Sequence, residues 1–179
     1  MPGPVFLEGE TVALRTIEEE DLPLLKRGVN DPDIWRLIGA RNPVNGKQER
    51  EFFEEVVSDE DSIDLLIAVD GEGVGIVTLR PDNGVVSQAE LGYWVVPDHQ
   101  GQGYGKEAVS RIVEYGFTQR ALHRIEARVF ECNDASRGLL ETLGFEHEGA
   151  WRHGTFLDGR YQDIHWYGLL DEEWDGQQH

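Results

Sequence analysis

The sequence of 179 residues is short of cysteine and contains no long apolar run. Its one cysteine, Cys132, cannot form an internal disulfide, and no signal peptide is visible at the start. Both features favour a reducing, cytoplasmic compartment. Because no stretch of about 18 apolar residues is present, we expect no membrane-spanning helix. The length predicts one domain over residues 1–170, followed by a polar tail over 171–179.

Positive charge is also scarce. Sixteen basic residues, of which only three are lysine, stand against 35 acidic residues and leave a net charge of −19. This charge argues against nucleic-acid binding through a basic surface and against docking on anionic membranes. Proteins that work in concentrated salt often have such a composition, because at about 1 M salt the Debye length falls to about 3 Å. We therefore expect a halophilic source, the alternative being an ordinary acidic cytosolic protein.

Metal-binding and nucleophile motifs are missing as well. The six histidines show no ligand spacing such as His-Glu-x-x-His, so no metal site is expected. No local motif places a histidine where it would activate Cys132, so a nucleophilic role for this thiol is not expected either.

Hydrophobic patterning predicts a mixed order of strands and helices. We expect strands over 11–16, 62–69, 74–79, 89–96 and 124–130 and on both sides of 158–159, and helices over about 16–27, 31–37, 47–57, 104–119 and 135–143. Asp70-Gly71 and Asp158-Gly159 are hairpin signals. Residues 89–130 form a strand–helix–strand unit. The fold class predicted is therefore α/β (α+β), with a mixed, mostly antiparallel sheet flanked by helices.

The most informative segment runs from Val95 to Lys106, where a glycine-rich loop lies between a strand and an amphipathic helix. Glycines let backbone amides approach a ligand closely, and amides at a helix N-terminus bind anions. Residues 104–128 carry five basic and three acidic residues, a local charge of +2. The segment therefore predicts a phosphate-binding loop.

Three phosphate-binding motifs compete for this loop. A Walker loop is excluded because only three residues separate Gly101 from Gly105 and Glu107 follows Lys106. The dinucleotide pattern G-x-G-x-x-A is satisfied by Gly103 to Ala108, but it belongs after the first strand of a parallel sheet, and here antiparallel-looking strands precede it. The third motif, Gln-x-x-Gly-x-Gly, is formed by Gln100, Gly103 and Gly105.

With this third motif the sequence resembles the GNAT acetyltransferase superfamily, and within it the ribosomal-protein-alanine N-acetyltransferase (Rim-type) branch. The resemblance extends from the first strand to Leu170. It rests also on the segments 89–95 (AELGYWV), 133–136 (NDAS), 143–145 (LGF), 148–149 (EG) and 159–163 (GRYQD) and on Arg152. These segments occur in the order of that branch.

The resemblance implies a single-domain GNAT fold that binds acetyl-coenzyme A (acetyl-CoA) between two splayed parallel strands, here 89–96 and 124–130. The pantetheine arm would pair with the edge of the first strand, and a main-chain N–H near Val96 would stabilise the oxyanion. The cofactor-binding residues implied are Val95, Val96, Gln100, Gly101, Gln102, Gly103, Tyr104, Gly105, Lys106 and Asn133. The amine would attack the thioester directly, without an acyl-enzyme.

The catalytic residues implied are Glu90, Ser136 and Glu126. Glu90 is the first candidate for the general base and Glu126 the second, while Ser136 would protonate the leaving thiolate. The Rim-type pattern places its base where this sequence has Thr155, so that base cannot be carried over, and His153 is a further candidate. Asn133 also has a simpler interpretation, since it can cap the helix that follows.

The acceptor expected from the resemblance is a protein or peptide N-terminal α-amine, for instance that of a ribosomal protein. Acetylation of an aminoglycoside, polyamine or amino acid is the alternative within enzymes, and a non-catalytic acyl-CoA sensor is the alternative outside them. Trp35, His153 and Phe156 are expected to line the acceptor pocket. A homodimer would agree with the resemblance, although no feature of the sequence requires one.

Overall fold

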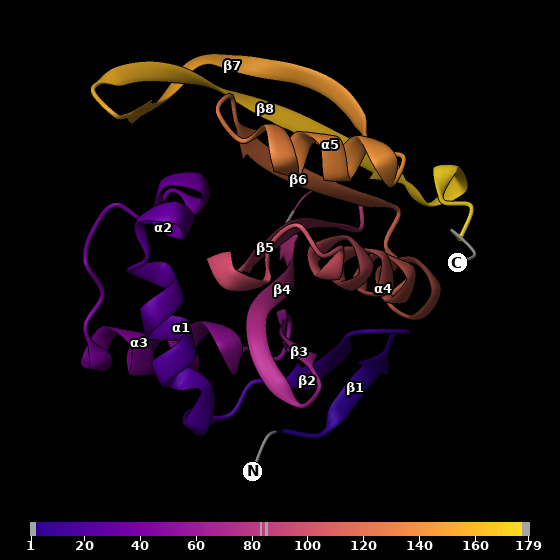
Figure 1. Ribbon diagram of the computed structural model, residues 1–179. Helices are drawn as coiled ribbons and strands as arrows, with labels where there is room; N and C mark the ends of the chain where they lie inside the picture. The colour runs from indigo at the N-terminus through magenta and orange to yellow at the C-terminus, as the bar shows by residue number, and fades with distance from the viewer. Residues whose placement is uncertain (1–2, 83, 85, 177–179) are drawn as a thin grey trace. The chain divides into compact units, whose positions relative to one another are not determined.

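A mixed β-sheet with helices organises the chain, as the pattern predicts (Figure 1). The computed structural model describes residues 3–82, 84 and 86–176. The strands are β1 (Val5–Glu8), β2 (Ala13–Thr16), β3 (Ile63–Val69), β4 (Glu72–Asp82), β5 (Gln88–Val95), β6 (Arg124–Phe130), β7 (Glu146–Leu157) and β8 (Arg160–Leu170). The helices are α1 (Leu22–Val29), α2 (Pro32–Ile38), α3 (Gly46–Phe52), α4 (Tyr104–Gln119) and α5 (Asp134–Thr142).

The chain divides into two units, one made of Met1–Arg80 and Gly92–Ile112 and the other of Pro81–Leu91 and Val113–His179. In the first unit the strand order is β1-β2-β3-β4-β5, and β1 to β4 pair antiparallel. In the second the order is β5-β6-β8-β7, in which β5 and β6 are parallel and the other pairs antiparallel. The predicted fold class is thereby confirmed.

The first unit places three helices, α1 to α3, beside its strands. A core cluster joins them to the sheet through Ile17, Leu22, Leu25, Ile34, Leu66, Ile76 and Trp94. Gly28 of α1 lies directly against the Trp94 ring, where an added Cβ would come within 2.3 Å of a ring carbon. Glycine at this position is what allows α1 to approach β5 so closely.

In the second unit α5 lies across β6 and beside the β7–β8 hairpin (Figure 1). Its apolar side buries Leu140, and Leu143 follows at the helix end. Tyr167 of β8 is fully buried among them, and its hydroxyl donates to Glu141 Oε1 at 3.0 Å. The predicted inward face of this helix is therefore present.

Three local features were not predicted from the sequence. Strand β1 was not predicted, and it pairs with β2. The helix expected over about 16–27 begins later, because a short 3-10 turn capped by Glu18, Glu19–Asp21, comes first and α1 begins only at Leu22. Within the stretch predicted as a polar tail, Asp171–Glu173 form another 3-10 turn and the Trp174 indole donates to Glu114 Oε2.

The described part of the chain contains no helix that is both long and apolar enough to cross a membrane. Across residues 3–82, 84 and 86–176, no group of three or more His, Cys, Asp or Glu side chains could hold a metal ion.

Candidate active site

The glycine-rich loop of the first unit is anchored to the strand that precedes it. The Val96 N–H donates to Val74 O at 2.8 Å, and Gln100 Nε2 donates to Val95 O at 2.8 Å. Pro97–His99 forms a 3-10 turn between these anchors. The Val96 amide is thus already used by the sheet, and the oxyanion role implied for an N–H near Val96 would fall to another amide.

Beyond these anchors the backbone is open. Gly101 and Gly103 have φ of +74° and +86°, in the left-handed region that favours glycine, and a Cβ added at either would meet nothing within 4 Å. The 16-residue helix α4 begins at Tyr104, and Glu107 N donates to Gly103 O at 3.0 Å. The amides ahead of Glu107 precede the helical ladder. Open backbone at the start of a long helix suits phosphate groups.

The side chains of the loop mainly stabilise its shape. The Tyr104 hydroxyl donates to Gln102 Oε1 at 3.1 Å, and the Tyr104 ring lies 6.4 Å from that of His99. All the cofactor-binding residues predicted between Val95 and Lys106 therefore belong to one continuous segment of the first unit.

The two glutamates predicted as bases lie next to each other in the second unit, because Glu90 of β5 is the register partner of Glu126 of β6. Each has its own arginine. Arg128 Nε donates to Glu90 Oε1 at 2.7 Å, and Arg124 lies 3.4 Å from Glu126 Oε2. The Arg128 guanidinium therefore occupies part of the acceptor capacity of the Glu90 carboxylate in the free protein.

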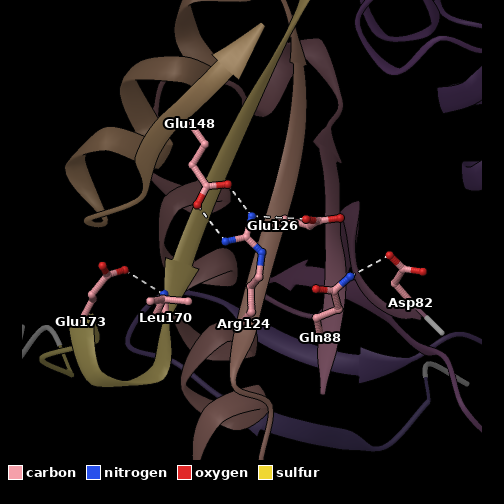
Figure 2. A network of polar contacts seen from close by, with 7 residues as sticks. All are labelled: Asp82, Gln88, Arg124, Glu126, Glu148, Leu170 and Glu173. Carbon is pink, nitrogen blue, oxygen red and sulfur yellow. Dashed lines mark hydrogen bonds and ion pairs between the residues drawn. The ribbon is translucent and has the colours of Figure 1, made fainter. Parts of the chain in front are cut away.

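Arg124 is held more firmly than Arg128. It donates to both carboxylate oxygens of Glu148 as well as to Glu126 (Figure 2). The hydrogen bond from Arg124 lowers the pKa of Glu148 against the opposing effect of burial. The same contact raises the pKa of Arg124. We call the side of β5 and β6 that carries Glu90, Glu126 and their arginines the charged face. The bidentate pair of Arg124 and Glu148 is a fixed feature of this face.

Two residues on the charged face, Arg128 and Trp166, were not predicted as site residues from the sequence. They are register partners in β6 and β8, and the Arg128 guanidinium lies 5.7 Å from the Trp166 ring centre. The Trp166 ring also packs on Trp151, with ring centres 4.8 Å apart. Alternation along β6 was the available signal, since residues 124, 126 and 128 of a strand point to the same side.

Asn133 and Ser136 lie at the start of α5. Asn133 Oδ1 accepts from Ser136 N at 3.2 Å, so Asn133 acts as the N-cap, the simpler of its two interpretations. Nearby, Cys132 is an exposed residue. Partial burial of its thiol still removes some water from it and raises the pKa of the thiol. A raised pKa disfavours the thiolate, so Cys132 lacks the activation that a nucleophile needs.

Two predicted acceptor residues meet on the β7–β8 hairpin, around a third aromatic that the sequence analysis did not single out. The His153 ring stacks on Tyr161 at 5.5 Å, and Phe156 meets Tyr161 edge-on at 5.1 Å. Phe156 and Tyr161 are exposed by 47% and 64%. Thr155, where the Rim-type branch has its base, is buried.

The third predicted acceptor residue, Trp35, belongs to α2 in the first unit. It is half-buried, and the Arg36 guanidinium lies 5.5 Å from its ring centre. Trp35 therefore belongs to a different unit from the hairpin residues His153 and Phe156.

Known proteins resemble this chain in sequence and in fold. The family profile described as "Acetyltransferase (GNAT) domain" matches residues 11–146. The chain belongs to the GNAT acetyltransferase family. It is accordingly an N-acetyltransferase, and its acetyl donor is acetyl-CoA.

Two relatives are named after different acceptors. YdaF of Bacillus subtilis, whose name describes it as a ribosomal N-acetyltransferase, is 28% identical over 175 residues, covering 94% of this chain and 96% of YdaF. Spermidine N(1)-acetyltransferase of Escherichia coli K12 is 28% identical over 154 residues, covering 86% of this chain and 82% of that enzyme.

One solved structure extends the second comparison. Spermidine N-acetyltransferase from Vibrio cholerae, in complex with CoA and spermine, matches with a TM-score of 0.84 and 26% identity over 91% of this chain and 97% of the other. Proteins named as ribosomal and as spermidine N-acetyltransferases therefore both resemble this chain over most of its length.

Proposed function

We propose that this GNAT enzyme transfers the acetyl group of acetyl-CoA to a primary amine of a small polycationic acceptor such as a polyamine. Similarity to the spermidine acetyltransferase that was solved with CoA and spermine is the observation that supports this acceptor. The N-terminal α-amine of a protein, favoured by the sequence, becomes the second candidate, supported by the name of YdaF. A net charge of −19 attracts either cation.

The cofactor would bind along the segment from Val95 to Lys106. Backbone amides of about Gln102 to Lys106 would bind its pyrophosphate. The edge of β5 at Val95, together with Val96 directly after it, would pair with its pantetheine arm. Asn133 would contact the pantetheine in addition to capping α5. The splay of β5 and β6 that this binding mode needs stays a prediction.

The acceptor amine would attack directly. The unactivated thiol of Cys132 supports this route, because an acyl-enzyme would need a nucleophile. A lysine-like amine has a pKa of about 10.4 and an α-amine one of about 7.7–8.0, so a polyamine needs a base more than a protein N-terminus does. Glu90 remains our first candidate for that base, followed by Glu126 and His153, and Ser136 our candidate for protonating the thiolate.

The setting proposed for this reaction is the cytoplasm, in keeping with the single free cysteine. The exposed aromatics His153, Phe156 and Tyr161, and separately Trp35, are proposed to contact the acceptor. A homodimer remains a proposal that analytical ultracentrifugation would test.

The first test is thermal stabilisation by acetyl-CoA in about 2 M KCl, with NADH as the control ligand. A ligand at 100 times its dissociation constant adds about 2.7 kcal/mol, which shifts the melting temperature by several degrees. Stabilisation by acetyl-CoA alone supports the proposal, and stabilisation by NADH alone would mean that the loop binds a dinucleotide.

Turnover separates the two proposed acceptors. Release of CoA thiol in the presence of spermidine or of a peptide with a free N-terminus would identify the acceptor class. Tight binding of acetyl-CoA without turnover on either amine would contradict both proposed acceptors.

A further inference from the structure

We propose that Arg128 occupies a cation-binding subsite of the second unit and that a cationic group of the acceptor displaces it. The subsite consists of the Glu90 carboxylate and the indole of Trp166. This inference rests on the proposed function, because it takes the acceptor to be a polyamine.

The geometry shows what Arg128 is doing in the free protein. Its Nε donates to Glu90 Oε1 at 2.7 Å, while its guanidinium lies 5.7 Å from the centre of the Trp166 ring. A carboxylate and an aromatic face together form the environment that binds ammonium as well as guanidinium groups. The Arg128 side chain therefore lies where the ammonium group of a ligand would gain the same contacts.

Because the Arg128–Glu90 ion pair is exposed, little free energy is needed to separate it. The side chains of Arg128 and Glu90 are 48% and 35% exposed, so solvent and ligands reach the pair. Ion pairs at such exposure contribute little to stability. The long side chain of Arg128 can turn toward water while Glu90 and Trp166 stay on their strands.

Arg124 provides an internal comparison. Its side chain is 21% exposed, and it binds Glu148 through both carboxylate oxygens and Glu126 in addition. Removing it would leave two glutamates without a partner, whereas removal of Arg128 frees one. Of the two arginines on this face, Arg128 is the exchangeable one.

Charge then indicates the class of ligand. Once Arg128 has turned away, the face carries Glu90, Glu126 and Glu148 against Arg124, a local charge of −2. A dication or longer polycation balances this charge better than a monoamine does. Arg128 and Glu90 would thus determine specificity for polycationic acceptors.

Calorimetric titration of spermidine, with and without CoA, tests the subsite without any acetyl transfer. We expect Arg128→Gln to bind spermidine about three- to ten-fold more tightly than the natural chain at equal ionic strength, because the internal competitor is gone. The gain should disappear in the double variant Arg128→Gln/Glu90→Gln. Butylamine, a monocation, should gain less than spermidine.

Arg120→Gln is the matched control, since it removes the same charge from an exposed position of the second unit, directly after the end of α4. An equal gain in this control would assign the effect to net charge and overturn the inference. Unchanged or undetectable spermidine binding by Arg128→Gln, with CoA present or absent, would overturn it as well. If Arg128→Gln melts early, Arg128→Met keeps the apolar stem against Trp166 and takes its place.

Failure of the proposed function is a separate result. Spermidine that binds as predicted but accepts no acetyl group would contradict polyamine acetylation and leave the subsite intact. Spermidine that is acetylated equally well, with equal affinity, by the natural chain and by Arg128→Gln would contradict the subsite alone.

Discussion

The carboxylate of Glu107, in the first turn of α4, accepts hydrogen bonds from Thr11 in the turn between β1 and β2. Thr11 contributes its N–H at 3.0 Å and its hydroxyl, and the N–H groups of Glu10 and Val12 also point at this carboxylate. Burial alone would raise the pKa of Glu107, but these hydrogen bonds outweigh burial and lower it. An ionised side chain thus ties the helix after the glycine loop to the first strands.

Glu107→Gln should therefore destabilise the protein by about 1–2 kcal/mol at neutral pH, because an amide accepts these bonds more weakly than a carboxylate. The folded pKa lies below the unfolded value of about 4.3, so the stabilisation is present above that value and is lost as pH falls through the folded pKa. Urea unfolding from pH 7 down to acid should show the two proteins converging. Glu54→Gln, which removes an exposed charge, is the control, and an equal loss there would contradict the prediction.

A second prediction concerns the phosphate loop. Gly103→Ala should weaken acetyl-CoA binding about ten-fold, since the residue has a φ of +86° and its added methyl group would project into the open space above the loop. Fluorescence or calorimetric titration with acetyl-CoA measures the effect. Gly46→Ala, where a Cβ also meets nothing within 4 Å and φ is ordinary for a helix, should leave binding unchanged.

Helix α4 and its contact with Thr11 show which features the sequence could predict and which it could not. The helix over Tyr104–Gln119 and the hairpin turn at Asp158-Gly159 follow from local periodicity and turn chemistry, and the structure has both as predicted. The contact of Glu107 with Thr11 spans 96 residues, and no local pattern encodes it.

The two glutamates that we propose as bases show the same limit. Glu90 and Glu126 were identified from a family resemblance, but their arginine partners depend on strand register. Arg128 meets Trp166 only because β6 pairs with β8, the last strand in sequence, rather than with β7. Short-range reasoning could place these residues on strands and could not pair them.

The C-terminal segment supplies a third prediction. Trp174 donates its indole N–H to Glu114 of α4, and its ring lies 6.4 Å from that of Phe117. Trp174→Ala removes this contact together with half-buried aromatic area and should lower stability by about 1–2 kcal/mol. Trp174→Phe keeps the ring but not the N–H and should fall between the two. Equal melting temperatures for all three proteins would show that the segment contributes nothing.

Gly168 of β8 tests the charged network in Figure 2. A Cβ there would lie 2.4 Å from Glu148 Oε1 and 2.8 Å from an Arg124 nitrogen, so Gly168→Ala forces the two side chains apart. We expect the pKa of Glu148 to rise toward its ordinary value, because the hydrogen bond from Arg124 is what lowers it. Nuclear magnetic resonance titration of the Glu148 side chain measures this change. The loss of stability should stay below about 1 kcal/mol, as the pair is partly exposed; an unchanged pKa would mean that the pair simply re-forms beside the methyl group.

The acidic surface leads to a prediction about salt. Three consecutive acidic residues are exposed, namely Asp59, Glu60 and Asp61. They belong to a chain with a net charge of −19. Such a surface repels itself at low ionic strength, and salt should relieve that repulsion as the Debye length shrinks from about 10 Å at 0.1 M to about 3 Å at 1 M. The melting temperature should rise by several degrees between about 0.1 and 2 M KCl. A matched series in sucrose at equal osmolality separates screening from general solute exclusion, because sucrose leaves the Debye length unchanged. A melting temperature that does not respond to KCl would place the protein among ordinary acidic enzymes rather than halophilic ones.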